Sequence, residues 1–315
     1  MDSAQKVRPL NAGVLIGVDK LIYWQLTVFS WIGSQWAGVA HLGLAEKGFG
    51  NEEVEIKEID LRKFSHAQEK MEMLTQTNDK VKAENFDPEY LKKNPNETVP
   101  TLAASHLSQP LVDTRQILEY LDQSRPSVKG PNLTPVDLQD QSRATALIEL
   151  VHSNDLETGV IIFGCLNDSE FHRLQASPFM TYVAARQTAL EKYHSADPTN
   201  LFYGTKVIEN GALHSFLTGS PNADRTTFFA DTSAKYTRFA AGLNMLERQI
   251  LLPYAVGDHV TLADLHIAPW LSHTLYALGT TDPSDFSKLE GRIQQVVPNF
   301  KLGPKIPVVE EFWQT

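Results

Sequence analysis

The residues best suited to bind a ligand are gathered between positions 94 and 122. Their order predicts a turn, a short strand entered through Pro100, a second short strand, and a helix that begins at Asp113-Thr114. If the Val99-Pro100 peptide bond is cis, the backbone of Val99 turns outward and can pair with a ligand. The positive end of the helix favours an anion, whereas Asp113 favours an amine. The stretch therefore predicts a site for a carboxylate and an amine held side by side, unless it is simply a hairpin followed by an N-capped helix.

The same stretch resembles the glutathione-binding half of cytosolic glutathione S-transferases. The resemblance lies in two motifs, Asn94-Pro-x-x-x-Val-Pro-Thr-Leu102 and Asp113-Thr-x-x-Ile-Leu-x-Tyr-Leu121. In that family the Val-Pro step contacts the cysteinyl backbone of glutathione, and an acidic residue followed by a hydroxyl residue holds the γ-glutamyl end. The resemblance therefore implies glutathione as the cosubstrate, bound by Val99, Pro100, Asp113 and Thr114. The family more often has Glu-Ser at the last two positions, and Asp-Thr preserves both the charge and the hydroxyl.

A glutathione transferase must also hold the sulfur of glutathione as a thiolate, because the thiolate is the nucleophile and a free thiol titrates near pH ~8.5. Family members place a Ser, Tyr or Cys just after the first strand for this purpose. Counting back from Ala45-Glu-Lys-Gly48, the matching position is Ser34, at the predicted start of the first helix, where the hydroxyl and the helix dipole act together. Ser30 is the second candidate, in which case Ser34 is a plain N-cap. A third alternative is that neither serine acts on the sulfur.

These residues need a scaffold, and the first half of the chain predicts one of thioredoxin-like order. Residues 21–29 are rich in β-branched and aromatic side chains and predict a strand, and residues 54–61 alternate and predict a second. A helix over residues 35–47, ended by Gly48, lies between them. Strand, helix, strand, hairpin and helix together predict a mixed sheet covered by helices. An insertion over residues 62–86 is interpreted as a surface helix in preference to a lid or a partner surface.

The second half of the chain predicts helices, after a linker over residues 124–135. The predicted helices cover residues 137–166, 178–196, 231–252 and 284–297, whereas residues 199–222 are Gly-rich and predicted to be irregular. Thr261-Leu-Ala-Asp264 has the spacing of a capping box, with Val260 and Leu265 placed as a hydrophobic staple. This motif is similar to the segment that begins a buried helix in the transferase C-terminal domain.

The predicted fold class is accordingly an α/β thioredoxin-like N-terminal domain followed by an all-α C-terminal domain, which is the glutathione transferase architecture. The predicted boundaries are residues 1–125 for the glutathione-binding domain and residues 136–315 for the helical substrate-binding domain. A length of 315 residues is sufficient for two domains with a shared core. The extra length and the Gly-rich insertion indicate a specialised member of the fungal type, and the resemblance implies a serine-class member and a homodimer.

Composition argues against several other classes of function. A formal net charge of −10 argues against binding a phosphate backbone, so no nucleic-acid partner is expected. The apolar residues 21–32 are too few to span a bilayer, so no membrane partner is expected. The single cysteine, Cys165, precludes an internal disulfide, and with no evident targeting signal it indicates the cytoplasm. The ten histidines lack metal-ligand spacing, so no metal is expected, and His152 is interpreted as structural in preference to a residue of the substrate cleft.

The surroundings of Ser34 bear on the second substrate. Residues 34–41 contain no Arg or Lys, whereas the maleylacetoacetate isomerase class carries basic residues there for a doubly acidic substrate. Trp31 and Trp36 flank Ser34 instead and indicate a bulky, neutral, hydrophobic substrate, unless both belong to the core. The predicted function is activation of the glutathione thiolate for attack on a hydrophobic electrophile, in natural-product biosynthesis.

Two alternatives remain open. Addition of a thiolate to an electron-poor alkene gives a single bond that can rotate, so the same first step would serve a cis/trans double-bond isomerase that returns glutathione unchanged. Isomerisation requires the adduct to be enclosed, and the aromatic-rich residues 202–229 are a candidate lid. The second alternative is a non-catalytic binding module, because the transferase fold also serves that purpose in regulatory proteins.

Overall fold

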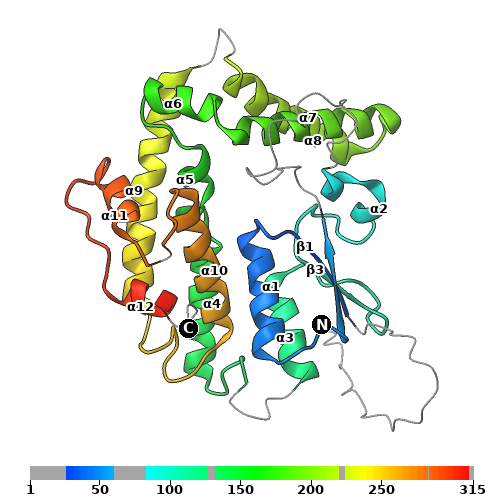
Figure 1. Ribbon diagram of the computed structural model, residues 1–315, viewed down its shortest axis with the longest axis vertical. Coiled ribbons are helices and arrows are strands. Elements are labelled where there is room, and N and C mark those ends of the chain that lie inside the picture. The colour runs from blue at the N-terminus through cyan, green and yellow to red at the C-terminus, as the bar shows by residue number, and fades with distance from the viewer. Residues whose placement is uncertain (1–25, 60–82, 126–131, 220–223, 283, 312–315) are drawn as a thin grey trace.

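The computed structural model describes residues 26–59, 83–125, 132–219, 224–282 and 284–311 (Figure 1). Five sequence predictions lie wholly or partly outside these ranges: the surface helix in the insertion, the first residues of the first strand, the last two residues of the second strand, the middle of the linker, and the end of the segment 199–222. The division into domains at residues 125 and 136 also stays a prediction.

A three-stranded sheet lies at the centre of the N-terminal part within the described residues. It consists of β1 (Leu26–Ser30), β2 (Val54–Glu58) and β3 (Thr101–Ala104), in the order β2-β1-β3. The central strand β1 is parallel to β2 and antiparallel to β3. It is buried almost throughout, as its Leu-Thr-Val-Phe sequence leads one to expect of a central strand. The second strand predicted after Pro100 is reduced to an isolated bridge between Leu102 and Leu111.

Two helices cover one face of this sheet, α1 (Gln35–Glu46) and α3 (Thr114–Ser124) (Figure 1). The two helices approach closely because α1 has a glycine at the contact: a Cβ on Gly43 would lie 2.3 Å from a methyl group of Leu118. On the other side of the sheet, Phe29 packs with Tyr90 from the short helix α2 (Pro88–Leu91), which follows a single 3-10 turn, η2 (Glu84–Phe86). This arrangement confirms the thioredoxin-like prediction.

The rest of the described chain is helical and confirms the predicted all-α C-terminal region. Its elements are α4 (Leu138–Val151), η3 (Asn154–Leu156), α5 (Gly159–Phe163), α6 (Asp168–Gln175), α7 (Pro178–Ala196), α8 (Leu201–Leu217), α9 (Arg225–Gln249), α10 (Leu262–Ala277), α11 (Ser287–Gln294) and α12 (Lys305–Glu311). Helix α7 has the bounds that the sequence predicts. Helix α9 begins earlier than predicted, because the Asp224 carboxylate caps it by accepting from the N–H of Thr227.

The prediction of one helix over residues 137–166 is wrong. Helix α4 ends at Val151, and the chain turns before α5 begins at Gly159. The turn contains Ser153, Asn154 and Asp155, whose side chains compete with the helix for backbone hydrogen bonds. The hydroxyl of Ser153 donates to the carbonyl of Leu150 at 2.7 Å and helps to close the last turn of α4.

The prediction that residues 199–222 are irregular is also wrong, because residues 201–217 form helix α8. Its glycines serve helix packing rather than a loop. A Cβ on Gly211 would lie 3.3 Å from Nε2 of Gln187 on α7, and one on Gly204 would lie 3.6 Å from Cε1 of His194 on the same helix. Small residues at these positions allow α7 and α8 to pair closely, and the pair lies across the top of the molecule (Figure 1).

The centre of the helical region is α10, which begins with the predicted capping box. The carboxylate of Asp264 accepts from the N–H of Thr261 at 2.9 Å and from the N–H of Ala255 at 2.7 Å, and it is fully buried. Leu265 is buried as the predicted staple requires, with Val260 half-buried against the same core. Helix α10 packs on α1 as well as on α4, so the sheet-containing part and the helical part share a core.

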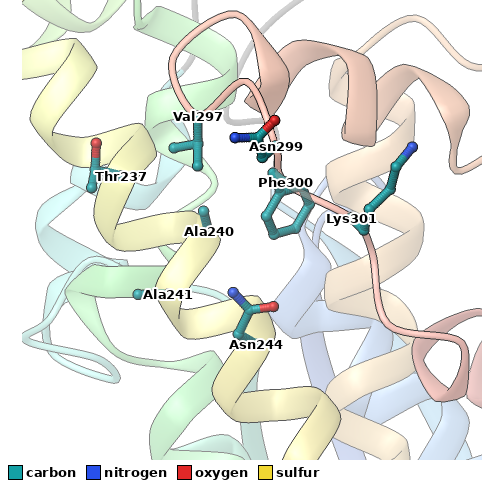
Figure 2. Close-up of a pocket in the computed structure, with 8 residues that line it drawn as sticks. All are labelled: Thr237, Ala240, Ala241, Asn244, Val297, Asn299, Phe300 and Lys301. Carbon is teal, nitrogen blue, oxygen red and sulfur yellow. The ribbon is translucent and has the colours of Figure 1, made fainter.

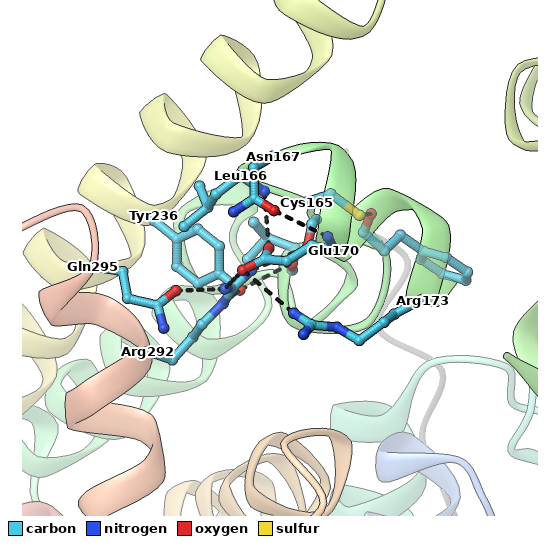
Figure 3. Close-up of polar contacts among 11 residues, drawn as sticks. Cys165, Leu166, Asn167, Glu170, Arg173, Tyr236, Arg292 and Gln295 are labelled. Atoms are coloured by element: carbon cyan, nitrogen blue, oxygen red, sulfur yellow. Dashed lines mark hydrogen bonds and ion pairs between the residues drawn. The ribbon is translucent and has the colours of Figure 1, made fainter. Parts of the chain in front are cut away.

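A partly buried ion pair joins α11 to α6 at the far end of the helical region (Figure 3). The guanidinium of Arg292 donates to both carboxylate oxygens of Glu170, at 2.6 and 2.8 Å, and to the Tyr236 hydroxyl at 2.8 Å. Cys165 lies beside this pair and is 2% exposed. Burial, with the nearby Glu170 charge, raises the pKa of the Cys165 thiol to about 11. Cys165 is therefore a core residue.

Candidate functional site

The sheet register brings the three predicted parts of the site to one end of the sheet. Phe29 near the end of β1 pairs with Thr101 at the start of β3, so the turn after β1 lies beside the Val99-Pro100 step. The bridge between Leu102 and Leu111 is antiparallel, so the chain beyond Leu111 runs toward the same end. The start of α1, the Val99-Pro100 step and the start of α3 are thus neighbours.

Ser34 is the N-cap of α1. Its backbone is extended, with φ −96° and ψ 122°, and its Oγ accepts from the N–H of Ala37 at 3.3 Å. The hydroxyl still carries its own proton, which is not used by this cap and can be donated elsewhere. The first N–H groups of α1 have no acceptor within the helix, so the Ser34 hydroxyl lies at the positive end of the dipole. In this geometry the Ser34 hydroxyl can accept the cap hydrogen bond and at the same time donate to a thiolate.

Ser30, the second candidate, lies in a different environment. It is the last residue of β1, is 2% exposed, and its Oγ lies 2.7 Å from Nε2 of His41 on α1. Its carbonyl accepts from the N–H of Ile59 at 2.7 Å. Both polar groups of Ser30 are therefore used inside the protein, which makes it less suited than Ser34 to contact a ligand.

The two tryptophans beside Ser34 have separate partners. Trp31 is half-buried and packs with the cluster of Phe29, Tyr90 and Val99, so it connects the turn after β1 to the Val99-Pro100 step. Trp36 stacks on the ring of His152 from α4, with a centroid separation of 3.7 Å and an interplanar angle of 14°. Ile32, which lies between Trp31 and Ser34 in the sequence, has a side chain that is 93% exposed. One tryptophan packs within the N-terminal part, and the other packs against the helical region.

The Val99-Pro100 peptide bond is cis. The loop before it is held by residues whose part the sequence patterns did not reveal. The hydroxyl of Tyr90 donates to the carbonyl of Thr98 at 2.6 Å. The side-chain amide of Asn94, which is fully buried, donates to the same carbonyl at 2.7 Å and to the Thr101 hydroxyl at 2.9 Å. The sequence motif includes Asn94 at the predicted turn but does not indicate that its side chain holds the loop.

Asp113 and Thr114 begin α3, as predicted. The Asp113 side chain is exposed, and its Oδ1 accepts from the N–H of Gln116 at 2.9 Å as the N-cap of the helix. Its second carboxylate oxygen remains available to an amine. Thr114 is only 6% exposed, and its Oγ1 lies 3.1 Å from Nε2 of His266 on α10.

His266 determines what the Thr114 hydroxyl can do. Nδ1 of His266 lies 2.7 Å from the carbonyl oxygen of Leu262, which can only accept, so Nδ1 carries the ring proton. Burial lowers the pKa of His266 to about 4, so the ring is neutral near pH ~7 and its Nε2 accepts from Thr114. The Thr114 oxygen can therefore accept from a ligand but has no proton left to donate to one. His266 was missed in the sequence, although it lies two residues after Asp264 of the capping box.

His152 lies at the junction of the two parts of the molecule. It follows the last residue of α4, stacks on Trp36 and lies edge-on to His266 with a centroid separation of 5.3 Å. This packing supports the structural interpretation of His152. Among the described residues, no group of three or more His, Cys, Asp or Glu side chains is arranged to hold a metal ion. None of the described helices is long and apolar enough to cross a membrane.

A separate groove of about 410 Å³ lies in the helical region (Figure 2). It runs between α9 and the segment after α11, and none of the predicted site residues lines it. The lining residues are Thr237, Ala240, Ala241, Asn244, Val297, Asn299, Phe300 and Lys301.

Comparison with known proteins agrees with the N-terminal architecture. Residues 28–130 match a family model described as glutathione S-transferase, N-terminal domain. No curated protein matches the chain.

Several solved structures are similar in chain course. Glutathione transferase F7 from Populus trichocarpa is 16% identical with a TM-score of 0.45, over 91% of this chain and 98% of that one. A glutathione transferase homologue from Sulfitobacter with bound glutathione is 17% identical with a TM-score of 0.46, over 93% and 100%. A maleylacetoacetate isomerase from Anaeromyxobacter dehalogenans with bound glutathione is 21% identical with a TM-score of 0.41, over 91% and 89%.

Proposed function

We propose, from the premise that residues 28–130 belong to the glutathione S-transferase N-terminal domain family, that this protein is an enzyme that uses glutathione as its cosubstrate. The observation that carries the proposal is the meeting of three ligand-binding features at one end of the sheet. They are the hydroxyl of Ser34, the backbone of Val99 beside Pro100, and the acidic start of α3 at Asp113.

Each feature suits one part of glutathione. The backbone of Val99 would pair with the cysteinyl residue, and Asp113 would bind the α-ammonium group. The first N–H groups of α3 would bind the α-carboxylate. Thr114, whose proton goes to His266, would accept from the ammonium group together with Asp113. The Ser34 hydroxyl would then donate to the sulfur, and with the dipole of α1 it would stabilise the thiolate.

The second substrate is a hydrophobic electrophile. Near Ser34, the exposed Ile32 and the half-buried Trp31 offer apolar contact, and residues 34–41 contain no Arg or Lys for an acidic substrate. Glutathione adds to the electrophile through its sulfur, and the adduct is released. We further propose that the protein acts in natural-product biosynthesis, is located in the cytoplasm and forms a homodimer.

Conjugation is preferred to isomerisation for a structural reason. The isomerase hypothesis relied on residues 202–229 as an insertion that supplies a wall or lid to enclose the adduct. Most of these residues form α8 and the start of α9, and α8 packs along α7 as an ordinary helix pair. The segment that was expected to enclose the adduct therefore consists mostly of regular helix, and this removes the reason for preferring isomerisation.

The test begins with calorimetry of glutathione binding to the full-length protein, with the dipeptide cysteinylglycine as the matched control. We expect glutathione to bind and the dipeptide, which lacks the γ-glutamyl group, to bind much more weakly. Turnover of a neutral enone with substoichiometric glutathione then separates the reactions. One thioether formed per glutathione supports conjugation, and product beyond one equivalent without thioether indicates isomerisation. Absence of glutathione binding would favour the binding module.

A further inference from the structure

The loop that presents Val99 contains a carboxylate held in an unusual position. Glu97, two residues earlier, has a positive φ of 60°, a conformation that few non-glycine residues adopt. Its N–H donates to the carbonyl of Asn94 at 3.1 Å, and its carbonyl accepts from the amide of Asn85 at 3.2 Å. The side chain is only 11% exposed. The hydrogen bonds on both sides thus hold the backbone of Glu97, whereas its carboxylate depends on a partner from the helical region.

A lysine from the helical region neutralises this carboxylate. Nζ of Lys206 on α8 lies 2.9 Å from Oε1 of Glu97, and the Lys206 side chain is 32% exposed. The other oxygen, Oε2, is buried and has no hydrogen-bond partner among the residues that the structure describes. Glu209 on α8 is a second neighbour of Lys206, at 3.5 Å, but it is 59% exposed. Glu97 is therefore the acid that needs Lys206, because a carboxylate out of solvent is costly without a counter-charge.

The helix that carries Lys206 is anchored on the same part of the sheet-containing region. The hydroxyl of Tyr203 on α8 donates to the carbonyl of Phe86 at 2.8 Å, and both side chains are buried. The guanidinium of Arg186 on α7 lies 4.7 Å from the centre of the Phe86 ring. The pair of helices α7 and α8 lies beside α2 in Figure 1. The position of Lys206 relative to the loop is thus set by packing that does not involve the ion pair.

We propose that Lys206 is a positioning residue for glutathione, acting through Glu97 on the backbone of Val99. The inference rests on the proposed function, because it assigns to α8 a part in forming the glutathione site. With Lys206 in place, the Glu97 carboxylate stays under α8 and the chain from Glu97 to Val99 keeps the course that exposes its backbone to the ligand. Without it, the carboxylate moves to solvent and pulls on the loop that Tyr90 and Asn94 hold at the Thr98 carbonyl, so the backbone of Val99 is less well placed for the ligand.

The central experiment is Lys206→Met in the full-length protein, which keeps the aliphatic length and removes the charge. We expect the Kd and the KM for glutathione to rise about tenfold, because the backbone of Val99 is no longer held in place for the ligand. The KM for the electrophile and kcat at saturating glutathione should stay within about twofold of the parent values, because binding energy alone is lost. Lys206→Arg should restore the glutathione affinity. Glu209→Gln, on the same helix, is the matched control and should bind glutathione normally.

A double variant distinguishes positioning from a general loss of structure. A glutamine at position 97 needs no counter-charge, so Glu97→Gln combined with Lys206→Met should bind glutathione more tightly than Lys206→Met alone. A purely structural role would lower Tm and raise both KM values together, and the double variant would bind no better than the single one. If Lys206→Met does not fold, the comparison of the double variant with Glu97→Gln serves instead, and equal affinities support the inference.

Two failures are separable in this design. If the parent protein binds no glutathione, the proposed function fails and this inference fails with it. If the parent binds glutathione and Lys206→Met binds it equally well, Lys206 has no positioning role and the proposed function stands. The inference would also be overturned if the double variant bound glutathione more weakly than the parent protein while Glu97→Gln bound it normally.

Discussion

Oγ1 of Thr114, the first residue of α3, lies 3.1 Å from Nε2 of His266 in the middle of the helical region. This hydrogen bond joins α3, whose first residues form part of the candidate glutathione site, to the buried helix α10. It places the neutral imidazole as an acceptor and directs the Thr114 proton away from the ligand. The state of His266 therefore affects both the stability of the shared core and the start of α3.

The first prediction concerns pH. A histidine in the unfolded chain titrates near pH ~6.5, whereas burial lowers the pKa of His266 to about 4 in the folded protein. Between these values only the unfolded chain takes up the proton, so stability falls as the pH is lowered from 6.5 toward 4. We expect the free energy of unfolding to be about 2 kcal/mol lower at pH ~5 than at pH ~7 from this group. Urea unfolding at the two pH values measures it.

The control for this prediction is His266→Asn, which cannot titrate in this range. Its free energy of unfolding should change less between the two pH values than that of the parent, although it is lower at both. An identical pH dependence in the two proteins would show that other groups carry the effect.

A second prediction follows from the Thr114 hydroxyl. Thr114→Val keeps the shape of the side chain but leaves Nε2 of His266 buried without a donor, so we expect a loss of about 1–3 kcal/mol in the free energy of unfolding. Thr114→Ser keeps the hydroxyl and should lose much less. Denaturant unfolding of both variants provides the measurement, and equal losses would argue that the methyl group matters rather than the hydrogen bond.

The sequence predicts the local parts of this protein better than their long-range contacts. The cap at Asp113 and the capping box at Thr261 are set by neighbouring residues, and both occur where they were predicted. Helix α8 was missed because its glycines suggested a loop, whereas Gly204 and Gly211 allow contact with α7, which local patterns do not reveal.

The same distinction holds within the candidate site. Ser34 and Asp113 are cap residues with signatures over three or four positions, so their places at helix starts could be predicted. His266 is separated from Thr114 by 152 positions, and Lys206 is separated from Glu97 by 109 (206 − 97). Such pairs depend on tertiary packing, and a single sequence contains no periodic signal for them.

A third prediction concerns Cys165, the single cysteine of the chain. Its pKa of about 11 and its burial leave almost no thiolate near pH ~8, so native protein should react with a thiol-specific reagent at least about a hundredfold more slowly than unfolded protein. The released chromophore measures the rate, with the same protein in guanidinium as the reference. Rapid labelling of native protein would place the thiol nearer to solvent than the core described above.

A fourth prediction tests the amine-binding part of the site. Asp113→Ala should weaken glutathione binding by about 1.5–3 kcal/mol, the contribution of a charge-assisted hydrogen bond. Because Asp113 is also the N-cap of α3, the alanine variant should lose about 1 kcal/mol of stability as well. Asp113→Asn retains the cap and removes the charge, so it should bind weakly while remaining stable. Calorimetry and unfolding on both variants separate the two effects, and normal binding by the asparagine variant would contradict the assignment.

The last prediction tests Ser34 as the residue that activates the sulfur. A hydroxyl aimed at the thiolate stabilises the charge on the sulfur more than it stabilises the bound peptide. Ser34→Ala should therefore raise the pKa of bound glutathione by about one unit and lower kcat about tenfold to a hundredfold, with a nearly unchanged Kd for glutathione. Loss of the cap should also cost about 1 kcal/mol of stability.

The measurement is a titration of thiolate absorbance in the complex, with Ser30→Ala as the matched control. Ser30 is buried against His41, so its removal should leave the pKa of bound glutathione unchanged. If the pKa of bound glutathione shifted in Ser30→Ala and stayed normal in Ser34→Ala, Ser30 would be the residue that activates the sulfur. If neither variant shifts the pKa, the start of α1 stabilises the thiolate through its N–H groups and dipole alone.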